Sequence, residues 1–182
     1  MVRRGGFRNR NKGSALVEFA VVLPLLVVFI VGIYDFSGSF NQKQKIAQAA
    51  QEGAVVAGSQ PMTDVLSTNA SPDSLQQIVT VVSNSLMSNN IVPETGCSAP
   101  AGLRVSGLKW KYTITCGADD LTIVVDRGVI VNSGPPAVIG STVEVSYPYR
   151  WRFNSVIQLL IPGATYAAIT VLDEASTVHN QM

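Results

Sequence analysis

The fold is decided by residues 14–34, which read SALVEFAVVLPLLVVFIVGIY. Glu18 is the single charged residue in this stretch. At about 1.5 Å per residue, a helix of this length reaches about 30 Å, the thickness of the hydrocarbon core of a bilayer. The stretch therefore predicts a helix that spans a membrane.

Five cations precede this stretch with no acid among them, namely Arg3, Arg4, Arg8, Arg10 and Lys12. The whole chain has 13 cations, 12 acids and a net charge of +1, so the part after Lys12 is net acidic. Cations before a first hydrophobic segment normally stay in the cytoplasm. We therefore expect residues 1–12 to lie inside the cell and the chain after Tyr34 to be exoplasmic.

Composition supports a membrane-associated protein of modest size. Charged residues make up 14% of the chain, against roughly 25% in an ordinary soluble protein. The 182 residues allow one domain and an appendage, which excludes a large multidomain enzyme. A cleaved secretory signal has an apolar core of about 7 to 15 residues, shorter than this one. The small residues Ser37, Gly38 and Ser39 keep that alternative open.

Helical spacing continues beyond the apolar stretch. Small and apolar residues recur three and four positions apart, at Ile46, Ala49, Ala50, Gly53 and Ala57. We predict one helix over residues 14–58, ended by the sequence GSQP, with a stripe along which a sheet or a sister helix packs closely.

A second, shorter helix follows a connector at residues 62–70. Ser71 offers an N-cap and Pro72 a first helical residue, and an apolar face then recurs up to about Asn89. Residues 90–102 hold two prolines and two glycines and are predicted to form a loop that contains Cys97.

The rest of the chain is strand-like. Residues 108–116 alternate apolar and polar side chains, which places Cys116 on a buried face. Residues 121–125 and 129–132 flank Asp126-Arg127-Gly128 and predict a hairpin, and residues 142–149 and 166–172 are further β-prone runs. Two helices and about five strands indicate an α+β fold, with the helices on one face of an antiparallel sheet.

The two cysteines suit an oxidising compartment. Cys97 and Cys116 would close a loop whose cross-link contributes about 3 kcal/mol to stability. The alternative is two unpaired cysteines that pack as small hydrophobes.

An aromatic cluster near the C-terminus is a candidate partner surface. Tyr149, Trp151 and Phe153 alternate with Arg150 and Arg152, which suits a partner surface or an aromatic belt at a membrane interface. For Tyr149, and for Tyr147 before it, core packing is the competing interpretation.

Catalysis and nucleic-acid binding find little support. The single histidine, His179, is predicted to lie in a polar C-terminal tail, and Asp119-Asp120 is predicted to be a turn. Lys109 and Lys111 fall on alternating strand positions in an acidic domain, which favours a solvated face. We therefore expect no enzyme activity, no cofactor, no metal and no nucleic-acid partner.

Residues 12–26, KGSALVEFAVVLPLL, resemble the N-terminus of TadE-like proteins of tight-adherence pili, which are relatives of type IV pilins. The shared features are a basic leader, a glycine, a glutamate five residues later and a Leu-Pro-Leu-Leu core. Residues 32–36 and 49–54 resemble further family segments, with Gln51 where arginine is usual. Residues 143–149 and 167–174 are similar to the family's closing strands.

The resemblance implies that a prepilin peptidase cuts after Gly13 and leaves Ser14 as the new N-terminus. Glu18 would then pair with the freed amine of the same or a neighbouring subunit, while Phe19 and Pro24 would take part in assembly. Without such a partner, Glu18 would lie at the membrane edge and snorkel to the headgroups. The expected layout is a leader at 1–13, a helix at 14–58 that crosses the membrane at 14–34, and an exoplasmic pilin-like α+β domain at 59–182.

The function implied is that of a minor pilin or pseudopilin in a tight-adherence pilus or a related secretion system, in the bacterial inner membrane. Its partners would be the prepilin peptidase, other pilins and the proteins of the assembly platform. The role covers subunits of the fibre, of its base and of its tip. The alternatives are an uncleaved, signal-anchored binding or scaffold protein and an exported enzyme.

Overall fold

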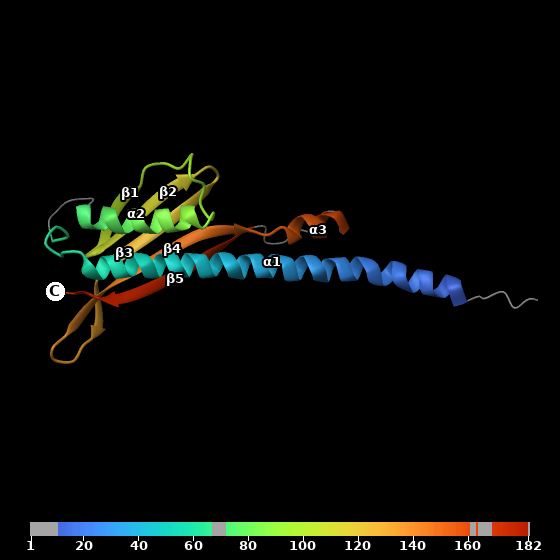
Figure 1. The fold of residues 1–182 in the computed structure, drawn as a ribbon, viewed down its shortest axis with the longest axis horizontal. Coiled ribbons are helices and arrows are strands. Elements are labelled where there is room, and N and C mark those ends of the chain that lie inside the picture. The colour runs from blue at the N-terminus through green and yellow to red at the C-terminus, as the bar shows by residue number, and fades with distance from the viewer. Residues whose placement is uncertain (1–10, 67–71, 161–162, 164–168, 182) are drawn as a thin grey trace, which may run out of the picture. The chain divides into compact units, whose positions relative to one another are not determined.

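The computed structural model describes residues 11–66, 72–160, 163 and 169–181. The cations Arg3, Arg4, Arg8 and Arg10 of the predicted leader, the predicted N-cap Ser71 and residues 166–168 of the last predicted strand lie outside the described residues. The elements, in chain order, are α1 (Asn11–Ser59), α2 (Asp73–Ser88), β1 (Ala101–Ser106), β2 (Lys109–Cys116), β3 (Asp119–Asn132), β4 (Val138–Arg150), α3 (Phe153–Leu160) and β5 (Ile169–His179) (Figure 1).

The predicted α+β fold is confirmed. The strands form one antiparallel sheet in the order β1-β2-β3-β4-β5, so every neighbour in the sheet is also a neighbour in the chain. The chain divides into two compact units, the first made of residues 1–37 and 151–168 and the second of residues 38–150 and 169–182. Helix α1 contributes to both units, and the sheet belongs to the second.

The core of the second unit lies between the helices and one face of the sheet. Residues 38–59 of α1 and the whole of α2 run alongside each other over the sheet (Figure 1). The predicted stripe on α1 is buried there, since Ile46, Ala49, Ala50 and Ala57 are all 0% exposed. At Gly53 an added Cβ would stand only 2.5 Å from Val82 of α2, so the small residue is required by the packing.

The alternation predicted for residues 108–116 is confirmed in β2, which begins one residue later. Trp110, Tyr112, Ile114 and Cys116 are buried, while the residues between them are exposed or half-buried. Three buried apolar residues of β3 (Leu121, Ile123, Val125) and three of β4 (Val143, Val145, Tyr147) complete the same apolar layer. A period of two thus identifies the core face, as expected for a sheet covered on one side.

The hairpin predicted at Asp126-Arg127-Gly128 is wrong. Both flanking runs belong to the single strand β3, whose register against β4 shifts between Asp126 and Val129. The Gly128 N–H donates to Asp126 Oδ1 at 3.0 Å, a local hydrogen bond that suits a bulge as well as a turn. The chain reverses instead at residues 133–137, where two consecutive prolines cannot donate to a sheet.

Three other predictions need correction in the sheet. Asp119-Asp120 is not a turn, because both residues pair with β2 and the turn is made by Gly117, at φ 67°, and Ala118. Strand β1 includes two residues of the predicted loop and was not foreseen. The last strand is β5, longer than predicted, and it includes His179, which therefore does not lie in a tail.

The start of α2 also differs from the prediction. Pro72 is the N-cap rather than the first helical residue, and it supplies no capping side chain. The side chain of Asp64 does so from the connector, where it accepts the Ser74 N–H at 2.9 Å and the Ser74 hydroxyl at 2.9 Å. The helix is thus capped by a residue ten positions upstream, which the local pattern of sequence does not reveal.

Candidate functional site: helix α1 and the residues that meet it

The predicted processing site lies in the first turns of α1. Gly13 and Ser14 are both exposed, and a Cβ added at Gly13 would meet no atom within 4 Å. Packing therefore gives no reason for a glycine at this position. Since glycine also weakens a helix by about 0.5 to 1 kcal/mol relative to alanine, a requirement from outside the chain explains it better.

Glu18 lies one turn after Ser14 on the same face of α1. The Ser14 hydroxyl donates to Glu18 Oε1 at 3.5 Å, the long limit for a hydrogen bond, and both residues are exposed. Within the described part of the chain, no ion pair is recorded for this carboxylate. The structure therefore leaves the charge of Glu18 accessible to a group from another molecule.

Most residues of the apolar stretch after Glu18 are exposed, and none is buried. Phe19 is 63% exposed and Pro24 is half-buried inside the helix, which continues through the proline. One helix among the described residues, α1, is long and apolar enough to cross a membrane. The most apolar part of this helix has a mean hydropathy of 2.8, and none of that part is buried. Exposed apolar side chains on this scale are expected in contact with lipid or with other helices.

Asp35 ends the apolar stretch and has a role that sequence reasoning missed. Its side chain is 1% exposed, and its Oδ2 accepts the backbone N–H of Phe153, the first residue of α3, at 2.6 Å. Next to it, the rings of Phe36 and Trp151 meet edge to face at 5.3 Å. The signal in the sequence is a lone acid directly after 16 uncharged residues.

The aromatic residues after β4 divide between core and surface. Tyr147 is buried, and burial followed by the nearby charge of Asp119 raises the pKa of its hydroxyl, with a smaller opposing effect of Arg150. Tyr149, Trp151 and Phe153, the predicted partner surface, are each half-buried. At Gly38 of α1 an added Cβ would lie 2.7 Å from the Tyr149 hydroxyl oxygen, so that tyrosine packs against the helix.

Polar bonds hold the second half of α1 to the sheet. Lys43 Nζ lies 3.0 Å from Glu174 Oε1 on β5, and Gln42 Nε2 donates to the Pro148 carbonyl at 3.4 Å. A second ion pair lies within the sheet, where Arg150 of β4 donates from Nη2 and Nε to the two carboxylate oxygens of Asp119 on β3, at 2.7 and 3.2 Å. Such a two-bond fork is among the stronger polar contacts, and it raises the pKa of Arg150.

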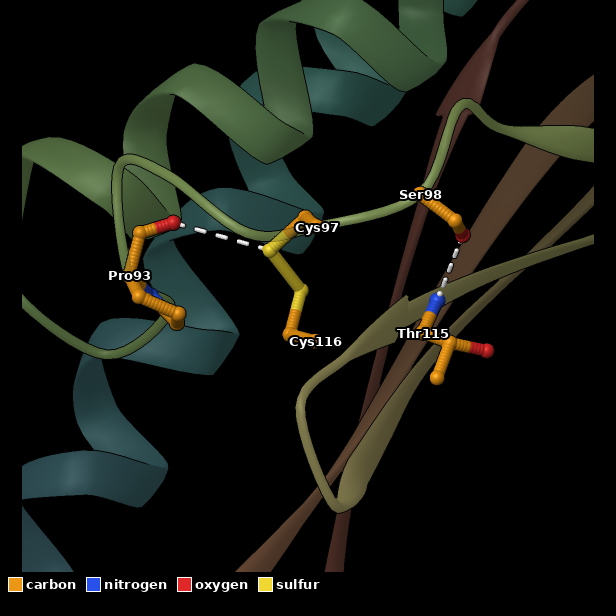
Figure 2. Close-up of a disulfide and its surroundings, with 5 residues drawn as sticks. All are labelled: Pro93, Cys97, Ser98, Thr115 and Cys116. Atoms are coloured by element: carbon orange, nitrogen blue, oxygen red, sulfur yellow. Dashed lines mark hydrogen bonds between the residues drawn. A yellow bond between two sulfur atoms is a disulfide. The ribbon is translucent and has the colours of Figure 1, made fainter.

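Cys97 and Cys116 are joined in a disulfide, with their sulfur atoms 2.05 Å apart (Figure 2). Beside it, the Ser98 N–H donates to the Thr115 carbonyl at 2.8 Å and the Thr115 N–H to the Ser98 hydroxyl at 2.9 Å. Figure 2 also marks an approach of 3.5 Å between Cys97 Sγ and the Pro93 carbonyl, which is a contact only, since an oxidised sulfur carries no proton. The bond fastens the loop after α2 to the end of β2.

A buried polar cluster lies at the end of α1 in the second unit. Arg127 is 0% exposed and donates from Nη2 to the Gln60 carbonyl at 2.8 Å. Burial lowers the pKa of this guanidinium, and the charge of Asp64 opposes that effect. Burial alone would raise the pKa of Asp64, but hydrogen bonds with Ser74, and smaller ones with the backbone of Asp64 itself and of Val65, together lower it. The cluster ties the connector to β3 and supplies structure rather than an open site.

The two remaining candidates are the lysines of β2 and a metal site. Lys109 is half-buried and Lys111 exposed on the sheet face opposite the helices, where Lys109 pairs with Asp126 in register. Among the described residues, no group of three or more His, Cys, Asp or Glu side chains is placed to hold a metal ion.

Part of the chain matches a known protein family. Residues 13–55 match the family model described as TadE-like protein. The match begins at the predicted processing glycine and ends within the buried part of α1, so it covers both the apolar stretch and the small-residue stripe. No curated protein and no solved structure matches the chain. The resemblance predicted from the sequence is confirmed for residues 13–55, which are similar to TadE-like proteins.

Proposed function

We propose that this protein is a minor pilin or pseudopilin that helps to assemble a tight-adherence pilus, anchored in the bacterial inner membrane by α1. The observation that carries the proposal is the TadE-like match over residues 13–55, which coincides with the exposed apolar stretch of α1 and its docked second half. The sheet domain would then be exoplasmic, and the protein would act by binding other subunits rather than by catalysis.

Processing would proceed at the Gly13-Ser14 bond. The absence of any packing need at Gly13 supports this, as do the exposure of both residues and the position of Glu18 five residues after the glycine. Helix α1 begins at Asn11, so the peptidase would have to unwind its first turn, which is inexpensive because helix ends fray. The new amine would belong to Ser14, one helical turn from the Glu18 carboxylate.

Assembly would use that new pair of charges. A carboxylate at the centre of a membrane helix costs about 2.5 to 3.5 kcal/mol, so an amine at matching depth on a neighbouring subunit would be strongly preferred. The exposed Phe19 and the half-buried Pro24 would pack against the same neighbour. Other pilins, the assembly platform and the prepilin peptidase are therefore the partners proposed.

Mass spectrometry of the membrane-extracted protein tests the processing step. We expect an N-terminus at Ser14 when the chain is expressed with a prepilin peptidase. An intact N-terminus would favour the uncleaved, signal-anchored scaffold, and an N-terminus near Phe40 would mean ordinary signal cleavage and exclude the pilin.

Two matched variants separate cutting from assembly. Glu18→Gln keeps the size of the side chain and removes its charge, so insertion and cutting should stay normal while co-purification with pilus subunits falls. Gly13→Leu should block cutting first and assembly only as a consequence. Normal pilus recovery with Glu18→Gln would refute the charge pairing and support a glutamate that merely snorkels.

A panel of hydrolase substrates with the purified protein tests the non-enzymatic assignment, which any specific turnover would overturn.

A further inference from the structure

Helix α3 starts against α1 through a buried carboxylate. The N–H of Phe153, its first residue, donates to Asp35 Oδ2 at 2.6 Å, and the Asp35 side chain is 1% exposed. An aspartate that accepts a first-turn N–H does the work of an N-cap, and its negative charge meets the positive end of the helix dipole. The bond therefore makes burial of this carboxylate tolerable and fixes where α3 begins.

The contact also fixes the level along α1 at which α3 starts. Asp35 directly follows the apolar stretch that ends at Tyr34, and the Phe153 ring lies 3.9 Å from a Cβ placed on Gly32. One residue further, Phe36 and Trp151 are in edge-to-face contact. If α1 crosses a bilayer at residues 14–34, the start of α3 lies where hydrocarbon gives way to headgroups.

The composition of α3 suits that level. Its residues 153–160, FNSVIQLL, include no charged residue, and apolar residues recur three and four positions apart in the sequence. At about 1.5 Å per residue its eight residues reach about 12 Å, too short to cross a membrane. Trp151 and the exposed Arg152 precede it, and tryptophan is enriched where membranes meet water.

We propose that α3 is an interfacial helix that starts among the lipid headgroups on the exoplasmic side of the membrane, with Trp151 at that depth. The inference rests on membrane insertion of α1, as proposed above. Lipid is favoured over a protein partner because the exposed apolar surface of α1, which is apolar enough for a bilayer, extends to the level at which α3 starts. Ile33, Tyr34 and Phe36 of α1 are 65% or more exposed at this level. Asp35 is a positioning residue in this arrangement.

The two tryptophans of the chain allow a direct test. Trp110 is 0% exposed in the sheet core, so Trp110→Phe isolates the emission of Trp151. The full chain is reconstituted in lipid nanodiscs that contain phosphatidylcholine brominated either near the headgroup or near the chain ends. We expect Trp151 to lose most of its emission with shallow bromine, less with deep bromine, and little with iodide in the water. Trp151→Phe, which leaves Trp110, should respond to none of them. If Trp110→Phe fails to fold, the difference between wild type and Trp151→Phe measures the same quantity.

The outcomes are distinct. Quenching of Trp151 by iodide but not by brominated lipid would place α3 in water, and quenching by neither would place it against protein; either result overturns the proposal. Extraction with alkaline carbonate is run in parallel. A chain that stays in the membrane while Trp151 is unquenched refutes the interfacial helix and leaves the anchored pilin standing, whereas a chain that is extracted refutes both.

Variants at Asp35 test its positioning role. Asp35→Asn keeps a side-chain oxygen that accepts the Phe153 N–H, so shallow-bromine quenching should persist. Asp35→Ala removes the acceptor and should shift the emission of Trp151 to longer wavelength and reduce that quenching. Equal quenching in the two variants would show that the bond to Phe153 does not set the depth of α3.

Discussion

Gly53 lies where α1 is confined between α2 and the sheet, and Gly53→Ala tests that packing. A Cβ at this position would stand 2.5 Å from Val82 Cγ2 and 3.2 Å from Val143 Cγ1. Both distances are shorter than the about 3.5 to 4.0 Å of ordinary carbon contacts. The two valines are 0% exposed, so neither can move into solvent to make room.

Two effects of opposite sign determine the magnitude. Alanine is about 1 kcal/mol more favourable than glycine inside a helix, and overpacking of a buried site costs about 1 to 3 kcal/mol. Because the methyl group must displace two buried side chains from two different elements, we expect a cost in the upper half of that range. The free energy of unfolding should therefore fall by about 1 to 2 kcal/mol.

The measurement is denaturant unfolding of the full chain in detergent, followed by the fluorescence of the buried Trp110. Gln51→Ala, at an exposed position two residues away on the same helix, is the control and should stay within about 0.5 kcal/mol of wild type. Val82→Ala makes room for the new methyl group, so Gly53→Ala should cost less in that background. Stability of Gly53→Ala at or above that of wild type would refute close packing of α1 on α2 and β4.

Three further predictions concern the second unit. Reducing the disulfide between Cys97 and Cys116, which are 19 positions apart, should lower the free energy of unfolding by about 3 kcal/mol. The measurement is the denaturation midpoint, which should be lower with dithiothreitol than without it. Full thiol labelling of the unreduced native protein would contradict the bond. The lowered pKa of Asp64 means that its contribution to stability is present above the ordinary value of 3.8 and is lost as the pH falls through the lower folded value. Asp64→Asn should therefore flatten the acid limb of the stability profile, and an unchanged profile would remove Asp64 as its source. Arg127→Met keeps much of the side-chain volume without a buried cation, so its free energy of unfolding should stay within about 1 kcal/mol of wild type. Arg127→Ala should lower the free energy of unfolding by about 3 kcal/mol, and equal losses in the two variants would contradict this account.

Periodic patterns carried the successful predictions of the fold. The three- and four-residue spacing from Ile46 to Ala57 identified the buried stripe of α1, and the alternation from Trp110 to Cys116 identified the core face of β2. Both patterns are imposed by a single face that excludes water, so they are visible in local sequence. Strand β1 has no such pattern, because five of its six residues are exposed at the edge of the sheet.

The wrong predictions share a physical cause, which is that distant residues decide the local conformation. Asp126-Arg127-Gly128 has the composition of a turn, yet Arg127 is buried and bonded to Gln60, 67 positions away, and the strand continues through a bulge. Asp35 is bonded to Phe153, which lies 118 positions away. No pattern within a few residues of either group contains its partner, so only the fold reveals the contact.

The two acids that flank the apolar stretch of α1 differ in what their charges are available to do. Glu18 and Asp35 stand at the two ends of the apolar stretch, 17 positions and therefore about 26 Å apart along a helix. The charge of Asp35 is enclosed and bonded within its own chain, whereas Glu18 is exposed and receives only a long bond from Ser14. A second subunit can therefore be attracted to the N-terminal end of α1 but not, through charge, to Asp35. We infer that cutting at Gly13, which would place an amine beside the exposed Glu18, couples processing to assembly at that end of the apolar stretch, while Asp35 at the other end serves to hold α3 in place.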